Sequence, residues 1–409
     1  MRTWALFLIV TASAFGAERV TVTGKVTDAS GKPVEHATVL VYEAGVKKGY
    51  SIYCPTCYPD CGKHAATDSD GNYSIAGLNS DLVFNLLVMH DGYSSMFVKK
   101  VDSEKGAETA VLKPRVAPAD TRQVVRGHVV DAHGRPVADA VVEQQGVTFF
   151  RPDGQIGGTR FGGADGWIDS LSVTNEKGDF EIAYGQPAAR MILNVEPRGM
   201  SAKLFTLPTG PERKTLTVTD GATIRGRLLR DGKPVANAEI GIVTHSRRSG
   251  TTFSEMRIGT QEDGTFAITN VPAGRIYVAY AKMESLAAQN IAGDVVECET
   301  KDDGQEVDIG DIQLKPAYTL RGRVVLTDGK EIPPDMHVNL GADRAWDNQS
   351  VIIAPDGSFE FKGLASGVYG VMPSVKGYTF GDGFGQEVLV HHDVNNVTII
   401  LHPGKPGDR

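Results

Sequence analysis

The sequence lacks the short motifs that mark most enzymes. It contains no Gly-x-Ser-x-Gly, no His-Glu-x-x-His, no glycine-rich phosphate loop and no pair of carboxylates marked by its surroundings. Its ten histidines are scattered, and His391 and His392 near the end of the chain are expected to be surface residues rather than ligands. The sequence therefore predicts a protein without enzymatic activity.

An excess of positive charge is also lacking. Without Arg2, which lies in the leader described below, 41 basic residues stand against 50 acidic ones, for a net charge of −9. A mildly acidic chain is unsuited to nucleic acid or to an anionic membrane surface. We therefore expect no nucleic-acid partner.

Long apolar runs are confined to the first residues. Met1 and Arg2 precede the run Trp4–Val10, and small residues follow it with cleavage signals at Ala12-x-Ala14 or Ala14-x-Gly16. This order is typical of a secretory signal peptide over residues 1–17, because the apolar part is much shorter than the ~20 residues of a membrane-spanning helix. We expect a secreted or periplasmic protein of the cell envelope, with no membrane span.

Helical periodicity is absent, whereas glycine and proline are abundant. The chain has 47 glycines and 20 prolines, and its apolar residues alternate over short stretches instead of recurring every three to four residues. This composition favours many short strands joined by turns.

Two short sequence motifs, called the first and second phrase below, recur four times along the chain. The first contains Gly24, Gly127, Gly226 and Gly322, which are 103, 99 and 96 residues apart, and the second is "TDSDGNYSI" at Thr67 with counterparts at Thr174, Thr260 and Ile353. Repetition at a fixed period indicates tandem copies of one domain. We expect the copies at residues 18–115, 116–220, 221–316 and 317–409, the last one divergent because "KEIPPDMHV" replaces the usual "GKPVxxAxV".

The pattern G-x-V-x-D-x-x-G-x-P-V-x-x-A-x-V, followed by T-D-x-x-G-x-F/Y-x-I, resembles the carboxypeptidase regulatory-like domain. The resemblance implies a transthyretin-like (prealbumin-like) β-sandwich of about seven strands, within the carbohydrate-binding-like fold grouping, and implies no catalytic activity. The expected fold class is all-β, with four tandem seven-stranded Ig-like or transthyretin-like sandwiches. Short junctions between copies two, three and four and a longer proline-containing junction after copy one predict an elongated array.

The first two copies carry insertions between the two phrases. The spacing between the phrase glycines is 47 and 51 residues in copies one and two, against 38 and 35 in copies three and four. Both insertions emerge at the same end of the sandwich, where loops commonly carry function.

The first insertion holds three of the four cysteines in "YCPTCYPDCGKH". Outside the cytoplasm a disulfide is the favoured interpretation, with Cys54, Cys57, Cys61 and the distant Cys298 as candidate partners. Cys54–Cys57 and Cys57–Cys61 both remain open as pairings. The alternative is a zinc-like metal held by Cys54, Cys57, Cys61 and His64, or redox-active thiols; no other cofactor is expected.

Candidate binding residues lie in both insertions. In the first insertion they are Tyr53, Tyr58, Asp60 and Lys63, displayed by a disulfide-stapled loop together with His64. In the second insertion they are Phe161 and Trp167, and Trp346 in copy four and Phe253 in copy three occupy comparable segments. Sugar rings stack on such aromatic faces, although aromatics that fold back onto the domain are the simpler interpretation.

These observations lead to one functional hypothesis and two alternatives. The hypothesis is an exported, non-enzymatic binding or scaffolding protein that recognises an extracellular or envelope protein or glycan through loops at the sandwich ends. The alternatives are a metal-binding or redox protein that uses the cysteine loop, and a purely structural spacer.

Overall fold

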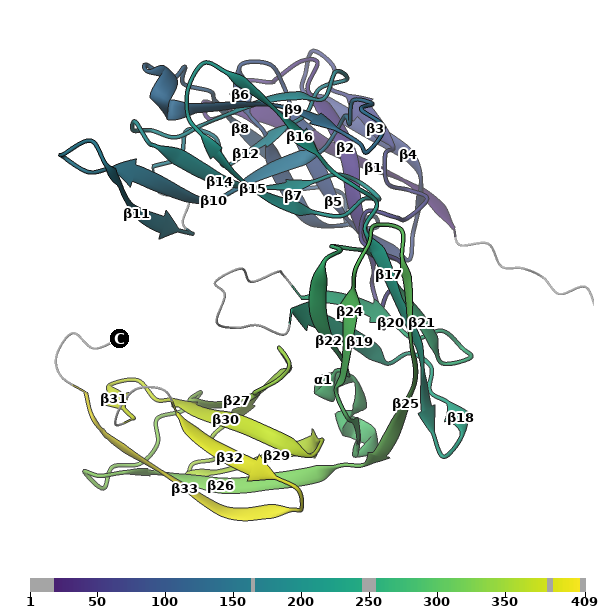
Figure 1. The fold of residues 1–409 in the computed structure, drawn as a ribbon, viewed down its shortest axis with the longest axis vertical. Helices are drawn as coiled ribbons and strands as arrows, with labels where there is room; N and C mark the ends of the chain where they lie inside the picture. Colours follow the sequence, from purple (N-terminus) through teal and green to yellow (C-terminus); the bar gives the residue numbers. More distant parts are fainter. Residues whose placement is uncertain (1–17, 163–165, 245–254, 381–384, 405–409) are drawn as a thin grey trace, which may run out of the picture. The chain divides into compact units, whose positions relative to one another are not determined.

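The computed structural model describes residues 18–162, 166–244, 255–380 and 385–404, so the expected signal peptide and Phe253 lie outside the described residues. The regular secondary structure of the described part is almost entirely strand (Figure 1). Its only helical segments are η1 (Thr121–Gln123), α1 (Met283–Leu286) and η3 (Ala287–Gln289). None of the described helices is long and apolar enough to cross a membrane. The all-β class expected from the sequence is confirmed.

The chain divides into two compact units. The first contains the described residues up to Lys47 together with Tyr58–Val116, and the second contains Lys48–Cys57 and the chain from Ala117 onward. Copy one therefore lacks ten residues of its own insertion, which pack as part of the other unit. Each unit is described separately below.

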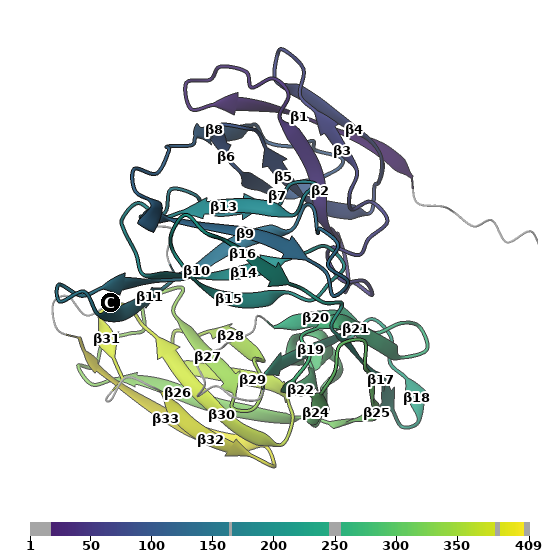
Figure 2. The same ribbon diagram turned by 45° about the horizontal axis from the view of Figure 1, so that its top comes forward.

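Copy one is a sandwich of two four-stranded sheets, drawn in purple and blue in Figure 2. One sheet has the order β4-β1-β8-β6 and the other β3-β2-β5-β7. The strands are β1 (Arg19–Asp28), β2 (Thr38–Val46), β3 (His64–Ala66), β4 (Asn72–Asn79), β5 (Leu82–Met89), β6 (Tyr93–Ser94), β7 (Met96–Asp102) and β8 (Ala110–Pro114).

Copy two repeats this plan in the second unit. Its sheets have the orders β13-β9-β16 and β11-β10-β14-β15, with β12 added beside β10. The strands are β9 (Val124–Val130), β10 (Val141–Phe150), β11 (Ile156–Phe161), β12 (Leu171–Val173), β13 (Asp179–Ala183), β14 (Arg190–Glu196), β15 (Lys203–Pro208) and β16 (Arg213–Thr217).

Copies three and four follow with two sheets each. Those of copy three are β18-β17-β25-β23, with β21 beside β17, and β20-β19-β22-β24; those of copy four are β29-β26-β33-β31 and β28-β27-β30-β32. Copy three has β17 (Ala222–Arg230), β18 (Lys233–Pro234), β19 (Glu239–Thr244), β20 (Met256–Gly259), β21 (Thr265–Val271), β22 (Arg275–Ala281), β23 (Ile291–Gly293), β24 (Val296–Thr300) and β25 (Glu306–Pro316). Copy four has β26 (Tyr318–Leu326), β27 (His337–Ala342), β28 (Asn348–Ile352), β29 (Ser358–Leu364), β30 (Gly367–Ser374), β31 (Tyr378–Thr379), β32 (Gln386–Val390) and β33 (Val394–Pro403).

Each copy buries its own hydrophobic core between its two sheets. In copy one, Val22 and Val26 of β1 and Tyr73 and Ile75 of β4 face inward, as the two-residue alternation predicts. A separate core for each copy is the packing expected of tandem sandwiches.

A glycine paired with an aromatic residue explains why both phrases recur. The phrase glycine of each first strand lies directly opposite the aromatic residue of the second phrase, in the pairs Gly24–Tyr73, Gly127–Phe180, Gly226–Phe266 and Gly322–Phe359. A Cβ atom added to these glycines would lie 2.4, 2.1, 2.9 and 2.3 Å from the nearest atom of the facing aromatic side chain. The aromatic ring therefore occupies the space that a side chain on the first strand would need.

The turn glycine of the second phrase has a different requirement. Gly71 has φ of +77°, a conformation that favours glycine, and its carbonyl accepts the N–H of Val26 at 2.8 Å. The same bond forms from the first strands of the other copies, also at 2.8 Å, to Gly178, Gly264 and Gly357. The second phrase is thus a turn that also fastens the first strand.

Copy four lacks one buried hydrogen-bond bridge that copies one to three share. In copy one the Thr67 hydroxyl accepts the N–H of Ala37 at 2.8 Å and donates to the carbonyl of Val34 at 2.6 Å. Thr174 and Thr260 make the same two bonds in copies two and three. In copy four the apolar Ile353 stands at this place, which matches the divergence of its sequence.

Candidate functional site

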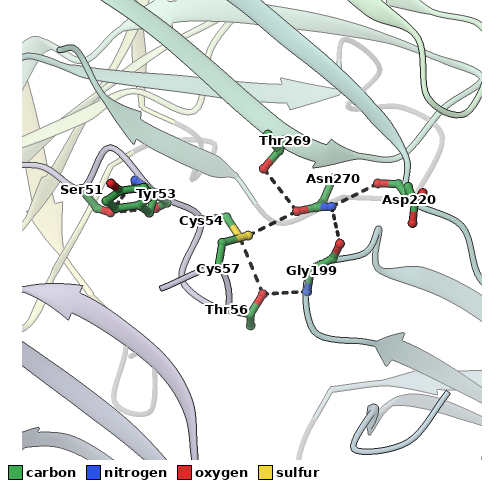
Figure 3. Close-up of a disulfide and its surroundings, with 9 residues drawn as sticks. All are labelled: Ser51, Tyr53, Cys54, Thr56, Cys57, Gly199, Asp220, Thr269 and Asn270. Atoms are coloured by element: carbon green, nitrogen blue, oxygen red, sulfur yellow. Dashed lines mark hydrogen bonds between the residues drawn. A yellow bond between two sulfur atoms is a disulfide. The ribbon is translucent and has the colours of Figure 1, made fainter. Parts of the chain in front are cut away.

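The first insertion contains one disulfide. Cys54 and Cys57 are bonded, with their Cα atoms 5.1 Å apart, and the N–H of Cys57 closes a turn on the carbonyl of Cys54 at 3.0 Å (Figure 3). Cys61 is half-buried and Cys298 is buried, and neither forms a disulfide. Burial raises the pKa of Cys298 to about 11, so this thiol resists ionisation.

Segment 48–57 is attached to copy three by backbone hydrogen bonds. The N–H of Gly259, at the end of β20, donates to the carbonyl of Ser51 at 2.5 Å. The N–H of Tyr50 donates to the side-chain oxygen of Asn237 at 3.3 Å. A Cβ atom on Gly259 would lie 2.7 Å from the carbonyl oxygen of Tyr50, so only glycine permits this close approach.

Asn270 organises the surroundings of the disulfide, as Figure 3 shows. Its backbone is left-handed, with φ of +59°, and its amide nitrogen donates to the carbonyls of Gly199 at 2.8 Å and Asp220 at 3.2 Å. The side-chain oxygen of Asn270 lies 3.6 Å from the Cys57 sulfur. The Thr56 hydroxyl accepts the N–H of Gly199 at 3.2 Å. These contacts hold the disulfide turn at one place on the second unit.

The disulfide leaves two exposed apolar side chains beside it. Ile52 is 43% exposed and Tyr53 is 50% exposed. The Tyr53 N–H bonds to the Ser51 hydroxyl at 3.0 Å, and that hydroxyl donates to the Tyr53 carbonyl at 2.7 Å. The backbone under Tyr53 is therefore held in place while its ring reaches solvent.

Three residues predicted to bind a partner have structural roles instead. Tyr58 is buried in the core of copy one. Asp60 is 2% exposed and accepts hydrogen bonds from Arg19 at 3.0 Å, from the backbone of Asn79 at 3.0 Å and from Lys63. The prediction of a displayed Tyr58 and Asp60 was wrong, because a tyrosine ring packed in the core and a fully bonded carboxylate are more stable inside the base of the loop. The Lys63 side chain is 35% exposed and contacts Asp60.

The proposed metal ligands are not assembled. Two of the four, Cys54 and Cys57, are consumed by the disulfide, and a ligating cysteine must be a thiolate. The exposed His64 ring contacts the carbonyl of Gly62 at 3.2 Å. The described residues contain no group of three or more His, Cys, Asp or Glu side chains placed to hold a metal.

The predicted aromatic residues of copies two and four behave differently from one another. Trp167 packs edge-on against Tyr184, with ring centroids 5.0 Å apart, so it folds back onto the domain. Trp346 is half-buried against a cluster that includes Tyr280 and Ala345. Phe161 is 68% exposed. Of the aromatic residues proposed for sugar stacking and described in the structure, only Phe161 presents its ring to solvent.

Sequence reasoning missed a buried charge cluster formed by copies three and four. Lys282 is 5% exposed on its side chain, and its Nζ lies 2.9 Å from Glu255 Oε1 and 3.6 Å from Asp347 Oδ1. The Tyr280 hydroxyl donates to Glu255, and the backbone N–H of Met283 donates to Asp347 at 2.8 Å. Burial is the main reason that the pKa of Asp347 rises to about 6. No short motif marks these residues, because their spacing is set by the packing of two copies.

Comparisons with known proteins identify the first copy. Residues 21–113 match the family model of the carboxypeptidase regulatory-like domain, so this part of the chain carries such a domain. The match covers less than a quarter of the 409 residues. No curated protein matches the chain by sequence.

Several solved structures align with the chain at low similarity. The TIE protein of Bacillus anthracis is 12% identical, with 95% of this chain and 74% of that chain covered, at a TM-score of 0.20. A streptococcal ancillary pilin is 13% identical over 69% of this chain and 100% of its own, at 0.23. The minor pilin GBS52 of Streptococcus agalactiae is 14% identical over 46% and 99%, at 0.25. TM-scores of this size support no inference about the function of this chain.

Proposed function

We propose that this chain is an exported, non-enzymatic scaffold whose sandwich copies present loops to an extracellular or envelope partner, a protein or a glycan. The observation that carries the proposal is the segment 48–57, in which a disulfide and backbone bonds hold Ile52 and Tyr53 exposed side by side. A rigid loop that displays an aromatic and an aliphatic side chain loses little conformational entropy on binding. Tyrosine is among the residues enriched at the energetically dominant centre of protein interfaces.

The exposed Phe161 on strand β11 is a second contact point in the same proposal. Strand β11 is an edge strand, and all of its residues except the half-buried Gly157 are exposed. Edge strands offer backbone groups for pairing with a partner. The Phe161 ring lies close to Gly146 of β10, since a Cβ atom there would come within 3.2 Å of it.

Capture of a partner from an envelope extract tests the proposal. The double variant Ile52→Ser/Tyr53→Ala is compared with the parent chain and with Ile276→Ser, which removes a 46% exposed side chain from β22. We expect the double variant to lose at least about tenfold in affinity, because buried aromatic anchors commonly contribute 2 kcal/mol or more. The control should bind like the parent. Equal binding by all three chains would refute the role of segment 48–57, and absence of any protein or glycan partner would favour a structural spacer.

A further inference from the structure

The first strand of copy one has an open edge that the other copies cover. Strand β1 pairs with β8 only from Val26, which lies opposite Ala110. In copies two and four the parallel partner strand also pairs with the glycine of the first phrase, as in Gly127–Lys214 and Gly322–Val397. In copy three β25 pairs with β17 on both sides of Gly226. Opposite Gly24 the chain at residues 105–109 is not a strand, although Ala107 donates to the Thr23 carbonyl at 3.1 Å.

A groove of about 760 Å³ lies at this open edge. Its lining comes from β1, β3, β4 and the segment before β8, and it is rich in polar side chains and small residues. The polar side chains that the argument uses are Thr23, Lys25, Asn72, Ser74, Lys105 and Thr109. The volume is that of an ordinary small-molecule site.

Copy one also differs from the others in the residue that covers the glycine. Tyr73 lines the groove, whereas the corresponding residues of the other copies are phenylalanines. Tyr73 is 4% exposed, and its hydroxyl has no hydrogen-bond partner among the described residues. A buried hydroxyl left without a partner costs about 1–3 kcal/mol. The groove of copy one therefore has an unsatisfied polar atom in its lining residue Tyr73.

Two lysines and one carboxylate line the groove, so its net charge is positive. Lys25 and Lys105 form no ion pair with any residue that the structure describes, within 4.0 Å. The carboxylate of Asp68 also lines the groove, but it accepts the N–H groups of Asp70 at 3.0 Å and Asn72 at 2.8 Å. These bonds, with that from the Asn72 side chain and a smaller attraction to Lys25, lower the pKa of Asp68.

Copy three offers a natural comparison at the equivalent place. A groove of about 510 Å³ surrounds Gly226, and its cations are paired with carboxylates of β25. Arg225 lies 3.3 Å from Glu306, and Arg227 lies 2.9 Å from Asp311. The aromatic residue there is Phe266, which has no hydroxyl. Copy three therefore has a similar groove, but the cations of that groove are paired with carboxylates and its aromatic residue has no hydroxyl.

We propose that the groove at Gly24 binds an acidic saccharide, a sugar unit that carries a carboxylate. Lys25 and Lys105 pair with the carboxylate, and the sugar hydroxyls exchange hydrogen bonds with Tyr73 and with the polar side chains of the lining. The small side chains of Ala65, Ala66 and Ala107 leave room for a sugar ring. The lining side chains Thr23, Asn72, Ser74 and Thr109 can exchange hydrogen bonds with the many hydroxyl groups of a sugar, which is why we favour the saccharide over an acidic peptide.

This site goes beyond the proposed function and does not depend on it. All its residues belong to the first unit, and none lies in segment 48–57 or in β11. Loss of saccharide binding would leave the partner-capture experiment above unaffected, and failure of that experiment would not affect the groove.

The test uses calorimetric titration of the full exported chain with short oligogalacturonate, and with the same oligosaccharide as its neutral methyl ester. We expect binding of the acid and much weaker binding of the ester. Tyr73→Phe, which installs the residue of the other three copies, should weaken binding about five- to tenfold through loss of one hydrogen bond. Lys25→Gln/Lys105→Gln should abolish the preference for the acid. The controls Lys32→Gln, on the exposed turn after β1, and Arg227→Gln, in copy three, should bind like the parent.

The thermal unfolding temperature without ligand tests the role of the Tyr73 hydroxyl independently. Because the unpartnered hydroxyl is unfavourable, Tyr73→Phe should unfold at the same or a higher temperature while binding more weakly. No binding by the parent chain, equal binding of acid and ester, or full binding by the double lysine variant would each overturn the proposal. Tighter binding of a tetraglutamate peptide than of oligogalacturonate would overturn the choice of ligand and assign the groove to an acidic peptide.

Discussion

The substitution Gly127→Ala tests the glycine–aromatic pair on which all four copies are built. The added Cβ would lie 2.1 Å from Cε1 and 2.4 Å from Cζ of Phe180, so the ring must move. The ring is 5% exposed and belongs to the core of copy two, which leaves it little room. Overfilling a packed core costs about 1–3 kcal/mol, whereas alanine in place of glycine in a strand gains roughly 0.5–1 kcal/mol. We expect a net loss of about 1–2 kcal/mol, since the steric term is the larger.

Hydrogen exchange of peptides from β9 and β13 is the appropriate assay, because a chain of several cores need not unfold in one step. The matched control is Gly158→Ala in the same copy, where an added Cβ meets nothing within 4 Å. We expect faster exchange in β9 and β13 for Gly127→Ala and unchanged exchange there for the control. Slower exchange in Gly127→Ala, as strand propensity alone predicts, would refute the argument that the aromatic ring fills the place of a side chain.

Three further outcomes follow from the site and the buried charges. Reduction of Cys54–Cys57 should speed exchange of the Gly259 amide, which bonds to the segment, and exchange that is unchanged would show that the disulfide does not hold it. Asp60→Ala removes a buried carboxylate that accepts three hydrogen bonds, but the two cations left behind are partly solvated, so we expect copy one to lose about 1–3 kcal/mol, with native-like stability as the contrary result. Asp347 has a pKa of about 6 in the folded chain against 3.8 as a free side chain, so the folded state binds its proton more tightly and stability falls as the pH rises through this window. The free energy of unfolding should fall by about 2–3 kcal/mol by pH 7, and this fall should disappear in Asp347→Asn. An identical pH profile of stability in that variant would contradict the role of Asp347. The elongated array remains a prediction, which small-angle scattering checks.

The repeated phrases were enough to predict the sandwich class and its four copies. Glycine, aromatic and turn residues act on their immediate neighbours, so a phrase such as "TDSDGNYSI" specifies a turn and an inward-facing tyrosine without knowledge of the rest. The sequence did not show why position 24 must be glycine, because the facing residue Tyr73 is 49 residues away in the chain. Strand pairing brings them together.

The candidate site was predicted less well than the fold. The Cys54–Cys57 disulfide was one of the pairings left open, since two cysteines so close in sequence meet at a single turn. The inward positions of Tyr58 and Asp60 were missed, because burial of a carboxylate depends on Arg19, which is far from it in sequence. The groove at Gly24 was missed for a similar reason, as it depends on where strand β8 begins to pair. Local patterns predict turns, whereas sites made by long-range pairing require the structure.

The central claim is that a disulfide holds segment 48–57 so that Ile52 and Tyr53 are exposed. The bonding state of the four cysteines tests this claim most directly. The exported chain is treated with a thiol-blocking reagent before digestion, and its peptides are identified by mass spectrometry together with its metal content. We predict a Cys54–Cys57 crosslink and alkylation of Cys61, with Cys298 alkylated once the chain is unfolded. Alkylation of Cys54, Cys57 and Cys61 together with stoichiometric zinc would contradict the account and establish a metal site in its place.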